Sequence, residues 1–291
     1  MSGFFKVMVN KTCLITGASR GLGKFLSIFF ADLKFDLILV ASNLQALQDV
    51  SDEIQLMPGQ KILLVDVDLS IDGFDIEMFE KISNFCVSID VLINNAAVQG
   101  PIGPFSDLIF KDWVHVFKVN FLAPASICHK VIEFMNDGGG TIINLSGGGA
   151  TGLRPNFSAY ASSKTALVRF TETIASELKD KNINANTIAP GMMPTDMLKE
   201  VLETPGNVTG LNKEKNAALN AFSTNFDMTD IGKLCVFLCS LENRKITGKL
   251  ISVKWDDWEV WPNNIESLTN SDIYTLRRIV GTDRGIKWGE K

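Results

Sequence analysis

Short apolar runs recur along the chain, and each is followed by a turn and a segment with helical spacing. The runs cover residues 12–16, 37–40, 62–65, 91–93, 141–145, 183–188 and 250–253. Runs that are apolar without interruption indicate strands that helices cover on both faces. Their alternation with helices predicts an α/β fold built on a doubly wound, parallel, seven-stranded sheet with right-handed crossovers.

No linker divides this pattern into separate folding units. We therefore expect a single domain over residues 1–253, followed by an extension, residues 254–291, that packs on the same domain or on a partner subunit. The most apolar stretch, residues 25–41, contains three charged residues, which make it too polar to cross a bilayer. The sequence predicts no contact with a membrane.

Charge and the rarer residue types exclude several classes of protein. The chain carries 28 Lys and Arg against 33 Asp and Glu, whereas a nucleic-acid-binding protein needs a basic face. Its two histidines, His115 and His129, argue against a Ser–His–Asp hydrolase and against a histidine-rich metal site. Five scattered cysteines and an N-terminus without a secretory pattern predict a reducing, cytoplasmic environment.

The first candidate for chemistry is a glycine-rich turn between the first predicted strand and the first helix. It reads Thr-Gly-Ala-Ser-Arg-Gly-Leu-Gly over residues 16–23. Glycines here allow a tight turn and let backbone amides approach a pyrophosphate, which the positive helix N-terminus attracts. Alone, the turn is a weak signal, because many glycine-rich turns are simply turns.

A tyrosine and a lysine form the second candidate. Tyr160 and Lys164 are four residues apart on a predicted helix, so their Cβ atoms lie about 5–6 Å apart on one face. A nearby ammonium favours the phenolate and lowers the pKa of a tyrosine from its usual value of about 10. Tyr160 can then exchange a proton near neutral pH, although an ordinary surface pair has the same spacing.

Together these two segments resemble the short-chain dehydrogenase/reductase family, and the resemblance extends over most of residues 7–253. It implies a Rossmann fold and hydride transfer between a nicotinamide cofactor and a small ketone or secondary alcohol. Further motifs match in order, namely Asp68-Leu69 after the third strand, Asn94-Asn95-Ala96-Ala97 after the fourth, Asn120 in the next helix, and Pro190-Gly191 with Thr195 after the sixth.

The resemblance also implies a role for each matching residue. Tyr160 is the expected general acid or base, Lys164 is expected to lower its pKa and bind the nicotinamide ribose, and Asn120 is expected to hold a water in a proton relay. No metal is implied. The expected cofactor-binding residues are Gly17, Ser19, Arg20, Gly21, Leu22, Gly23, Ser42, Asp68, Leu69, Asn94, Ala96, Tyr160, Lys164, Pro190, Gly191 and Thr195.

One catalytic position departs from the family's pattern. The family places a serine thirteen residues before the tyrosine, whereas this chain has Gly147 there and Ser146 one residue earlier. Ser146 is the candidate for the missing hydroxyl if the glycine triplet, residues 147–149, bulges. The alternatives are that backbone N–H groups of the triplet take its place, or that Ser146 only packs the loop.

The residues after the second strand bear on the choice of cofactor. An acidic residue there binds the ribose hydroxyls and repels a 2′-phosphate, but this chain reads Val-Ala-Ser-Asn over residues 40–43. Ser42 and Asn43 can donate to that phosphate, and Arg20 offers a planar fork that binds its oxygens in pairs. We therefore expect NADP(H), with NAD(H) as the alternative if Arg20 only faces solvent.

The extension is rich in aromatic residues. Four of the five tryptophans, Trp255, Trp258, Trp261 and Trp288, lie in it. Such side chains stack on sugar-like rings, and they are equally common where a tail docks or subunits meet. We favour docking over a lid. With the glycine triplet, the extension resembles reductases of bacterial polysaccharide pathways, which makes a sugar-related substrate one candidate.

The sequence therefore predicts a cytoplasmic oxidoreductase that prefers NADP(H) and interconverts a ketone and a secondary alcohol. The family resemblance implies a homodimer or homotetramer, with residues 197–215 forming a loop that closes over the substrate. The alternative is a protein with the same fold that does not catalyse this reaction. It is a catalytically impaired cofactor-binding or interaction protein, as the shifted serine suggests.

Overall fold

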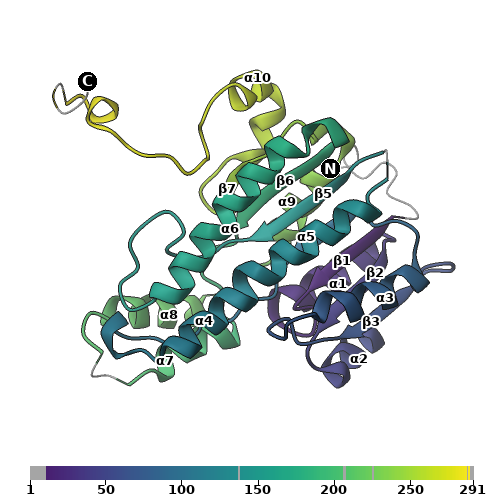
Figure 1. Ribbon diagram of the computed structural model, residues 1–291, viewed down its shortest axis with the longest axis horizontal. Helices are drawn as coiled ribbons and strands as arrows, with labels where there is room; N and C mark the ends of the chain where they lie inside the picture. Colours follow the sequence, from purple (N-terminus) through teal and green to yellow (C-terminus); the bar gives the residue numbers. More distant parts are fainter. Residues whose placement is uncertain (1–10, 137, 206–207, 225, 287, 289–291) are drawn as a thin grey trace.

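A seven-stranded sheet forms the centre of the computed structural model, which describes residues 11–136, 138–205, 208–224, 226–286 and 288. The strands follow the order β3-β2-β1-β4-β5-β6-β7, and all neighbours are parallel (Figure 1). The predicted fold class is therefore confirmed. The strands are β1 (Thr12–Thr16), β2 (Asp36–Ala41), β3 (Ile62–Asp66), β4 (Val91–Asn94), β5 (Gly140–Leu145), β6 (Ile183–Ala189) and β7 (Leu250–Ser252).

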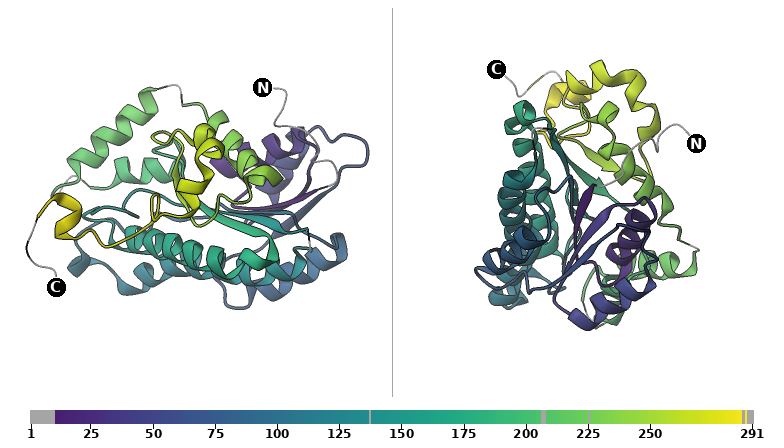
Figure 2. Two further views of the ribbon diagram at one scale, coloured as in Figure 1. Left: turned by 90° about the horizontal axis from the view of Figure 1, so that it is seen from above. Right: turned by 90° about the vertical axis from the view of Figure 1, so that its right-hand side faces the viewer.

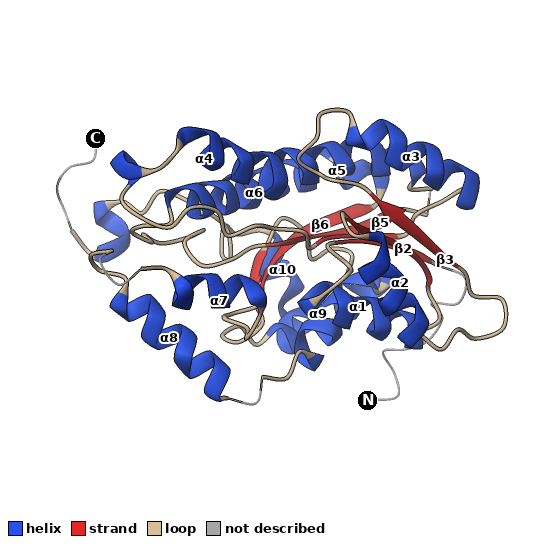
Figure 3. Ribbon diagram, turned by 90° about the horizontal axis from the view of Figure 1, so that it is seen from below, coloured by secondary structure: helices blue, strands red, loops and turns tan. Residues whose placement is uncertain are grey.

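Helices cover both faces of this sheet (Figure 3). One face packs against α1 (Gly21–Asp32), α2 (Leu44–Glu53) and α9 (Thr229–Cys239). The other face packs against α3 (Phe74–Phe85), α5 (Ala123–Phe134) and α6 (Ser158–Glu177), and α4 (Phe110–Phe117) precedes α5 on this side. None of the helices in the described ranges is long and apolar enough to span a bilayer.

Alternate residues of each strand enter the two cores. Ile15 and Leu39 pack with the helices of the first face, whereas Leu14 and Ile38 pack with those of the second, and all four are fully buried. Successive side chains of a strand point to opposite faces. A strand between two helical layers therefore buries its side chains on both faces, which explains the mainly apolar runs in the sequence. The polar exceptions Asn184 and Asn186 of β6 are buried and donate hydrogen bonds to the carbonyl oxygens of Leu238 and Ile246.

The carboxyl ends of the strands form the edge that carries the site. The strand order reverses at β1, with β2 and β3 on one side and β4 to β7 on the other. The connections leave that point in opposite directions, which opens a crevice at the carboxyl ends of β1 and β4. The glycine-rich turn follows β1 at this place, so the fold brings it to the position where such sheets bind ligands.

Two helices stand beside this edge where the sequence predicted a closing loop. Most of residues 197–215 belong to α7 (Asp196–Glu203) and to the start of α8 (Asn212–Ser223). The prediction of a loop was wrong here, because Pro205 and Gly210 interrupt the chain only between the two helices. An apolar cluster joins both helices to the start of α6, and it contains Phe157, Tyr160, Leu198, Val201, Leu211 and Ala218.

The extension packs against the domain that precedes it in the same chain (Figure 2, yellow). The Leu250 N–H of β7 donates to the Tyr274 carbonyl at 2.8 Å, which adds one backbone pairing at the sheet edge. The buried Lys249 ammonium donates to the carbonyl oxygens of Ser271 and Ile273 at 3.1 and 3.0 Å. The extension also contains η5 (Trp258–Asn264) and α10 (Ile265–Thr269), and it covers the free edge of β7.

Candidate functional site

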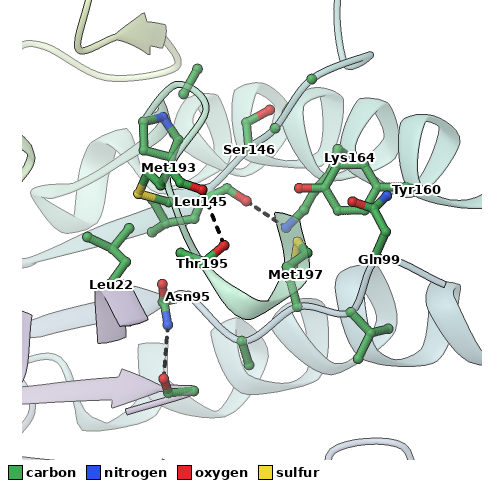
Figure 4. A pocket seen from close by; sticks show the side chains of 18 of the residues that line it. Leu22, Asn95, Gln99, Leu145, Ser146, Tyr160, Lys164, Met193, Thr195 and Met197 are labelled. Carbon is green, nitrogen blue, oxygen red and sulfur yellow. Dashed lines mark hydrogen bonds between the residues drawn. The ribbon is translucent and has the colours of Figure 1, made fainter. Parts of the chain in front are cut away.

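A cleft of about 1060 Å³ opens at the carboxyl edge of the sheet. The glycine-rich turn, the loops after β4, β5 and β6, and two residues of α6 line it (Figure 4). The structure therefore brings both sequence candidates into one cavity. The expected residues that line it are Gly17, Ser19, Arg20, Gly21, Leu22, Ser42, Asp68, Leu69, Ala96, Ser146, Tyr160, Lys164, Pro190, Gly191 and Thr195.

The glycine-rich turn packs closely against the loop after β4 and against α1. Gly17 has a φ of +65°, and a Cβ there would lie 2.8 Å from the Cα of Ala96. Gly23 lies behind the cleft wall, where a Cβ would lie 2.0 Å from the Gly17 carbonyl oxygen and keep α1 from packing on the turn. Among the described residues no side chain caps α1, so its first N–H groups can bind an anion. These features fit a pyrophosphate.

Asn95 supports this turn, whereas Asn94 was the residue expected to bind the cofactor. The Asn95 amide donates to the carbonyl oxygens of Thr16 and Gly17 at 3.0 and 3.1 Å. Asn94 ends β4, and its buried side chain donates to Oδ1 of Asn144 on β5 at 2.8 Å. The Asn94 side chain therefore lies within the fold, and the cleft wall begins one residue later.

Tyr160 and Lys164 lie one helical turn apart on α6, and both are buried. The Lys164 Nζ donates to the Leu145 carbonyl at 2.8 Å and lies 5.8 Å from the centre of the Tyr160 ring. Burial lowers the pKa of Lys164 to about 8, because the ammonium loses its hydration. The two side chains face the same cavity, in agreement with their spacing.

The pKa of Tyr160 is shifted in the direction opposite to the expectation. Burial raises the pKa of Tyr160, and the cation that opposes this shift is the Arg154 guanidinium. Arg154 stacks over the Phe157 ring at 3.8 Å and lies 5.6 Å from the centre of the Tyr160 ring. Arg154, in the loop after β5, is therefore the cation that lowers the pKa of the phenol, whereas the sequence indicated Lys164 for this role.

Glu214 holds this arginine in place. The Arg154 Nε and Nη2 both donate to one carboxylate oxygen of Glu214, at 3.3 and 3.0 Å. Both side chains of the pair are largely buried. Because Glu214 belongs to α8, the ion pair connects the loop after β5 with the helices beside the cleft.

The loop after β5 explains why the family's serine is absent. A Cβ at Gly147 would lie 2.2 Å from the hydroxyl oxygen of Tyr160, so a serine there would displace the phenol. Ser146 lines the cleft and is 5% exposed, and its Oγ has no hydrogen-bond partner within the described chain. Burying an unpaired hydroxyl lowers stability, which makes Ser146 a candidate to contact a ligand.

Asn120 clamps the loop after β4. It lies in a π-helical turn (Lys118–Leu122) and is fully buried. Its Oδ1 accepts from the Val98 N–H at 2.9 Å, while its Nδ2 donates to the Val98 carbonyl at 3.0 Å and to Ser163 Oγ at 3.2 Å. Single π-turns are frequent at functional sites. The relay role expected for Asn120 stays a prediction, and its side chain fixes the loop beside the cleft.

At the other end of the cleft, Arg20 and Ser42 lie in the wall as expected. The exposed Arg20 guanidinium pairs with Asp196 of α7 at 3.1 Å. Asn43, the other proposed phosphate ligand, instead caps α2 by accepting from the Ala46 N–H at 3.0 Å. Hydrogen bonds from Ser70 lower the pKa of the Asp68 carboxyl, so this part of the wall keeps a negative charge.

Gln99 in the wall was not expected from the sequence. It follows the asparagine motif, is 4% exposed, and has an Nε2 without a hydrogen-bond partner among the described residues. Its only signal in the sequence was its position shortly after a strand that leads into the cleft. Trp255, Asp256 and Tyr274 enter the wall from the extension, whose aromatic content was the signal for such a contact.

Comparison with known proteins finds sequences that are similar to this chain. The family profile of the short chain dehydrogenases matches residues 11–206. The 7alpha-hydroxysteroid dehydrogenase of Escherichia coli strain K12 is 30% identical over 249 residues, which cover 84% of this chain and 92% of that protein.

Solved structures have the same fold. YwfH, an NADPH dependent reductase involved in bacilysin biosynthesis, is 26% identical with a TM-score of 0.72, and the match covers 84% of this chain and 96% of YwfH. An NAD+-bound xylitol dehydrogenase matches with a TM-score of 0.74 at 24% identity, over 84% of this chain and 98% of that one. This last likeness concerns the fold alone.

Proposed function

Since the chain belongs to the short-chain dehydrogenase/reductase family and is an oxidoreductase of that class, we propose that it interconverts a small ketone and a secondary alcohol. The observation that carries this proposal is the placement of Tyr160 and Lys164 in one cleft with an uncapped, glycine-rich helix start. The family binds NAD(P)(H), which supplies or accepts the hydride.

The residues of the cleft suit such a cofactor from end to end. The glycine-rich turn and the N-terminus of α1 would hold the pyrophosphate. Ser42, Asp68 and Leu69 would hold the adenosine part, and Lys164 would bind the nicotinamide ribose. Pro190, Gly191 and Thr195 line the wall after β6 and would contact the nicotinamide.

In this proposal Tyr160 gives a proton to the substrate oxygen during reduction and takes it back during oxidation. Burial raises the pKa of Tyr160, so the phenol carries the proton that reduction needs at neutral pH but holds it more tightly than a free tyrosine does. Proton donation leaves a phenolate, which the nearby cations Arg154 and Lys164 stabilise. The buried surroundings keep water from competing for the proton.

We propose that NADP(H) is the preferred cofactor. No carboxylate follows β2 in the sequence, and Arg20 and Ser42 both line the adenosine end of the cleft. To bind the 2′-phosphate, the Arg20 guanidinium must first release the Asp196 carboxylate. Because both side chains of this ion pair are exposed, the pair is weak. The arginine therefore remains available to the cofactor.

This preference can be tested at Arg20. Arg20→Ala should weaken NADPH binding about tenfold, since a charge-assisted hydrogen bond contributes ~1.5–3 kcal/mol, and should leave NADH binding nearly unchanged. Asp196→Asn removes the competing carboxylate and should strengthen NADPH binding. Tryptophan fluorescence titrations with both cofactors measure these affinities. Equal losses for NADPH and NADH in Arg20→Ala would remove the preference.

The finer expectations about substrate and assembly belong to the same proposal. The exposed Trp255 ring at the cleft offers a surface on which a sugar-related substrate can stack. Phe105, Ile109 and Phe110 expose apolar surface beside α4, which suits contact with a second copy in a homodimer or homotetramer.

The cytoplasmic location stays the prediction made from the cysteines.

Turnover tests the proposal. The enzyme should oxidise NADPH with at least one member of a panel that contains a cyclic diketone, a β-keto ester and a ketose. Tyr160→Phe should lose at least ~10²-fold of that activity, which is the usual contribution of a general acid, and should keep its NADPH affinity. NADPH binding without turnover on any carbonyl compound would favour the alternative of a cofactor-binding protein, and full activity in Tyr160→Phe would reject the assigned acid.

A further inference from the structure

A buried amide group in the cleft wall has no partner. Gln99 is 4% exposed, lines the cleft, and its Nε2 makes no hydrogen bond to any part of the chain that the structure describes. Leaving a buried N–H donor unpaired costs stability, because the group loses its hydrogen bonds to water. Such a group in a cavity wall indicates that something which enters the cavity accepts the hydrogen bond.

The backbone around Gln99 is fixed on both sides. On one side, the Asn120 amide binds both the N–H and the carbonyl of Val98. On the other, Gly100 has a φ of +73°, and a Cβ there would lie 2.1 Å from Cγ2 of Val116 on α4. The backbone of Gln99 is therefore held in place between these contacts, and a donor carried on a fixed backbone can stabilise charge that develops on a bound substrate.

The position at which the family places a serine is closed in this chain. Gly147 lies directly against the Tyr160 hydroxyl, so no side chain can donate from there. The Ser146 N–H still pairs with the Ile188 carbonyl at 2.8 Å, and successive side chains along an extended chain alternate in direction. The Ser146 hydroxyl is accordingly directed away from the side that faces Tyr160, and in Figure 4 it points away from the Lys164 ammonium.

We propose that Gln99 is a catalytic residue that donates a hydrogen bond from Nε2 to the substrate oxygen and thereby replaces the serine hydroxyl. Figure 4 shows its amide at the same end of the pocket as Tyr160 and Lys164. This role rests on the proposed function. During reduction the carbonyl carbon gains a hydride from NADPH and the oxygen gains a proton from Tyr160. Gln99 keeps both its amide protons and stabilises the negative charge that develops on the oxygen.

The test replaces the amide by side chains of similar size. Gln99→Met cannot donate, and Gln99→Glu carries a charge that repels the developing oxyanion. The measurements are kcat and KM with NADPH and the best ketone of the panel, the NADPH affinity, and the melting temperature. Gln48→Met is the matched control, because Gln48 is an exposed amide on α2. Ser146→Ala tests the other unpaired group.

We expect Gln99→Met to lose about 10²-fold in kcat/KM, mostly in kcat, as for the removal of an oxyanion donor. Gln99→Glu should lose at least as much, and neither variant should bind NADPH more weakly. The melting temperature of Gln99→Met should rise, because the unpaired buried amide is gone. The Gln48→Met control should match the wild type, and Ser146→Ala should lose less activity than Gln99→Met.

Two results would overturn this role while the proposed function stands. The first is wild-type activity in Gln99→Met, and the second is a loss of activity that comes with a lower melting temperature, since the amide is then structural. A wild-type protein that binds NADPH but reduces no ketone would overturn the proposed function, and the role of Gln99 with it. The two failures are therefore distinguishable.

Discussion

At the scale of single residues, the hydroxyl of Tyr160 occupies the space that a side chain at position 147 would need. The separation of 2.2 Å between a Cβ at Gly147 and the Tyr160 oxygen is shorter than any nonbonded contact allows. Glycine is therefore part of how this chain positions its phenol. Restoring the family's residue should accordingly harm the site.

Gly147→Ser should lower kcat/KM at least tenfold, because the phenol must move out of line with the substrate, and misplacement by about 1 Å can cost 10²-fold. Gly148→Ser is the matched control, since a Cβ there meets only Arg154 atoms at 3.8 Å, an ordinary contact distance. Steady-state kinetics on both variants measures the difference. A gain of activity in Gly147→Ser would show that the site lacks the serine and tolerates its return.

Arg154 should set the pH dependence of reduction. Reduction needs protonated Tyr160, so its rate falls as the pH rises through the pKa of Tyr160. The Arg154 guanidinium lowers that pKa. Arg154→Met should therefore raise it and move the alkaline limb of the kcat/KM profile to higher pH.

The control for this profile is Arg278→Met, which removes an exposed arginine of the extension and should leave the limb unchanged. A limb that stays in place in Arg154→Met, or moves to lower pH, would contradict the electrostatic role of Arg154. The size of the activity loss alone would not decide the matter, because the ion pair with Glu214 also anchors α8.

At the scale of elements, the seven strands could be predicted almost residue by residue. Burial on both faces leaves a continuous apolar run, and such runs end where the sheet ends, as at Leu145 of β5. Helices α7 and α8 could not be predicted in this way. Their apolar residues, such as Leu198 of α7 and Ala218 of α8, pack in one small cluster with the start of α6, a contact that only tertiary packing reveals.

The same distinction between predictable and unpredictable parts applies to the residues of the site. Tyr160, Lys164 and the glycine-rich turn sit at fixed spacings on regular elements, so the sequence alone indicates their geometry. Gln99 and Arg154 reach the cleft from loops whose course depends on distant partners, Asn120 for one and Glu214 for the other. The different positions of Asn94 and Asn95 have the same cause, because the exact end of β4 decides which amide leaves the sheet.

At the scale of the whole molecule, the extension is part of the domain's stability and of the cleft. Its backbone pairs with β7, its carbonyls satisfy the buried Lys249, and its Leu276 N–H donates to Glu172 of α6 at 2.6 Å. Tyr274, which lies between these contacts, lines the cleft and packs on Trp261 with ring centres 4.5 Å apart. The aromatic residues of the extension therefore hold it on the domain, and two of them, Trp255 and Tyr274, also line the cavity.

Truncation after Asn270 should destabilise the protein by about 1.5–3 kcal/mol, the usual contribution of hydrogen bonds to a charged group, because the ammonium of Lys249 loses the carbonyl oxygens of Ser271 and Ile273. It should also raise KM, because the Tyr274 side of the cleft is lost. Truncation after Gly285 keeps the contacts at residues 271–276 and serves as the control. Thermal unfolding and steady-state kinetics measure both effects. Equal stability of the two truncated proteins would show that the extension only lies on the surface.

The most direct test of the central claim follows the hydride and the proton together. NADPH that carries two deuterium atoms at C4 is mixed with the best ketone of the panel, and the alcohol product is analysed by mass spectrometry. The account predicts one deuterium on the carbinol carbon with the wild type, and at least ~10²-fold slower formation of that product with Tyr160→Phe at unchanged NADPH affinity. An alcohol without deuterium, or equally fast formation by Tyr160→Phe, would contradict it.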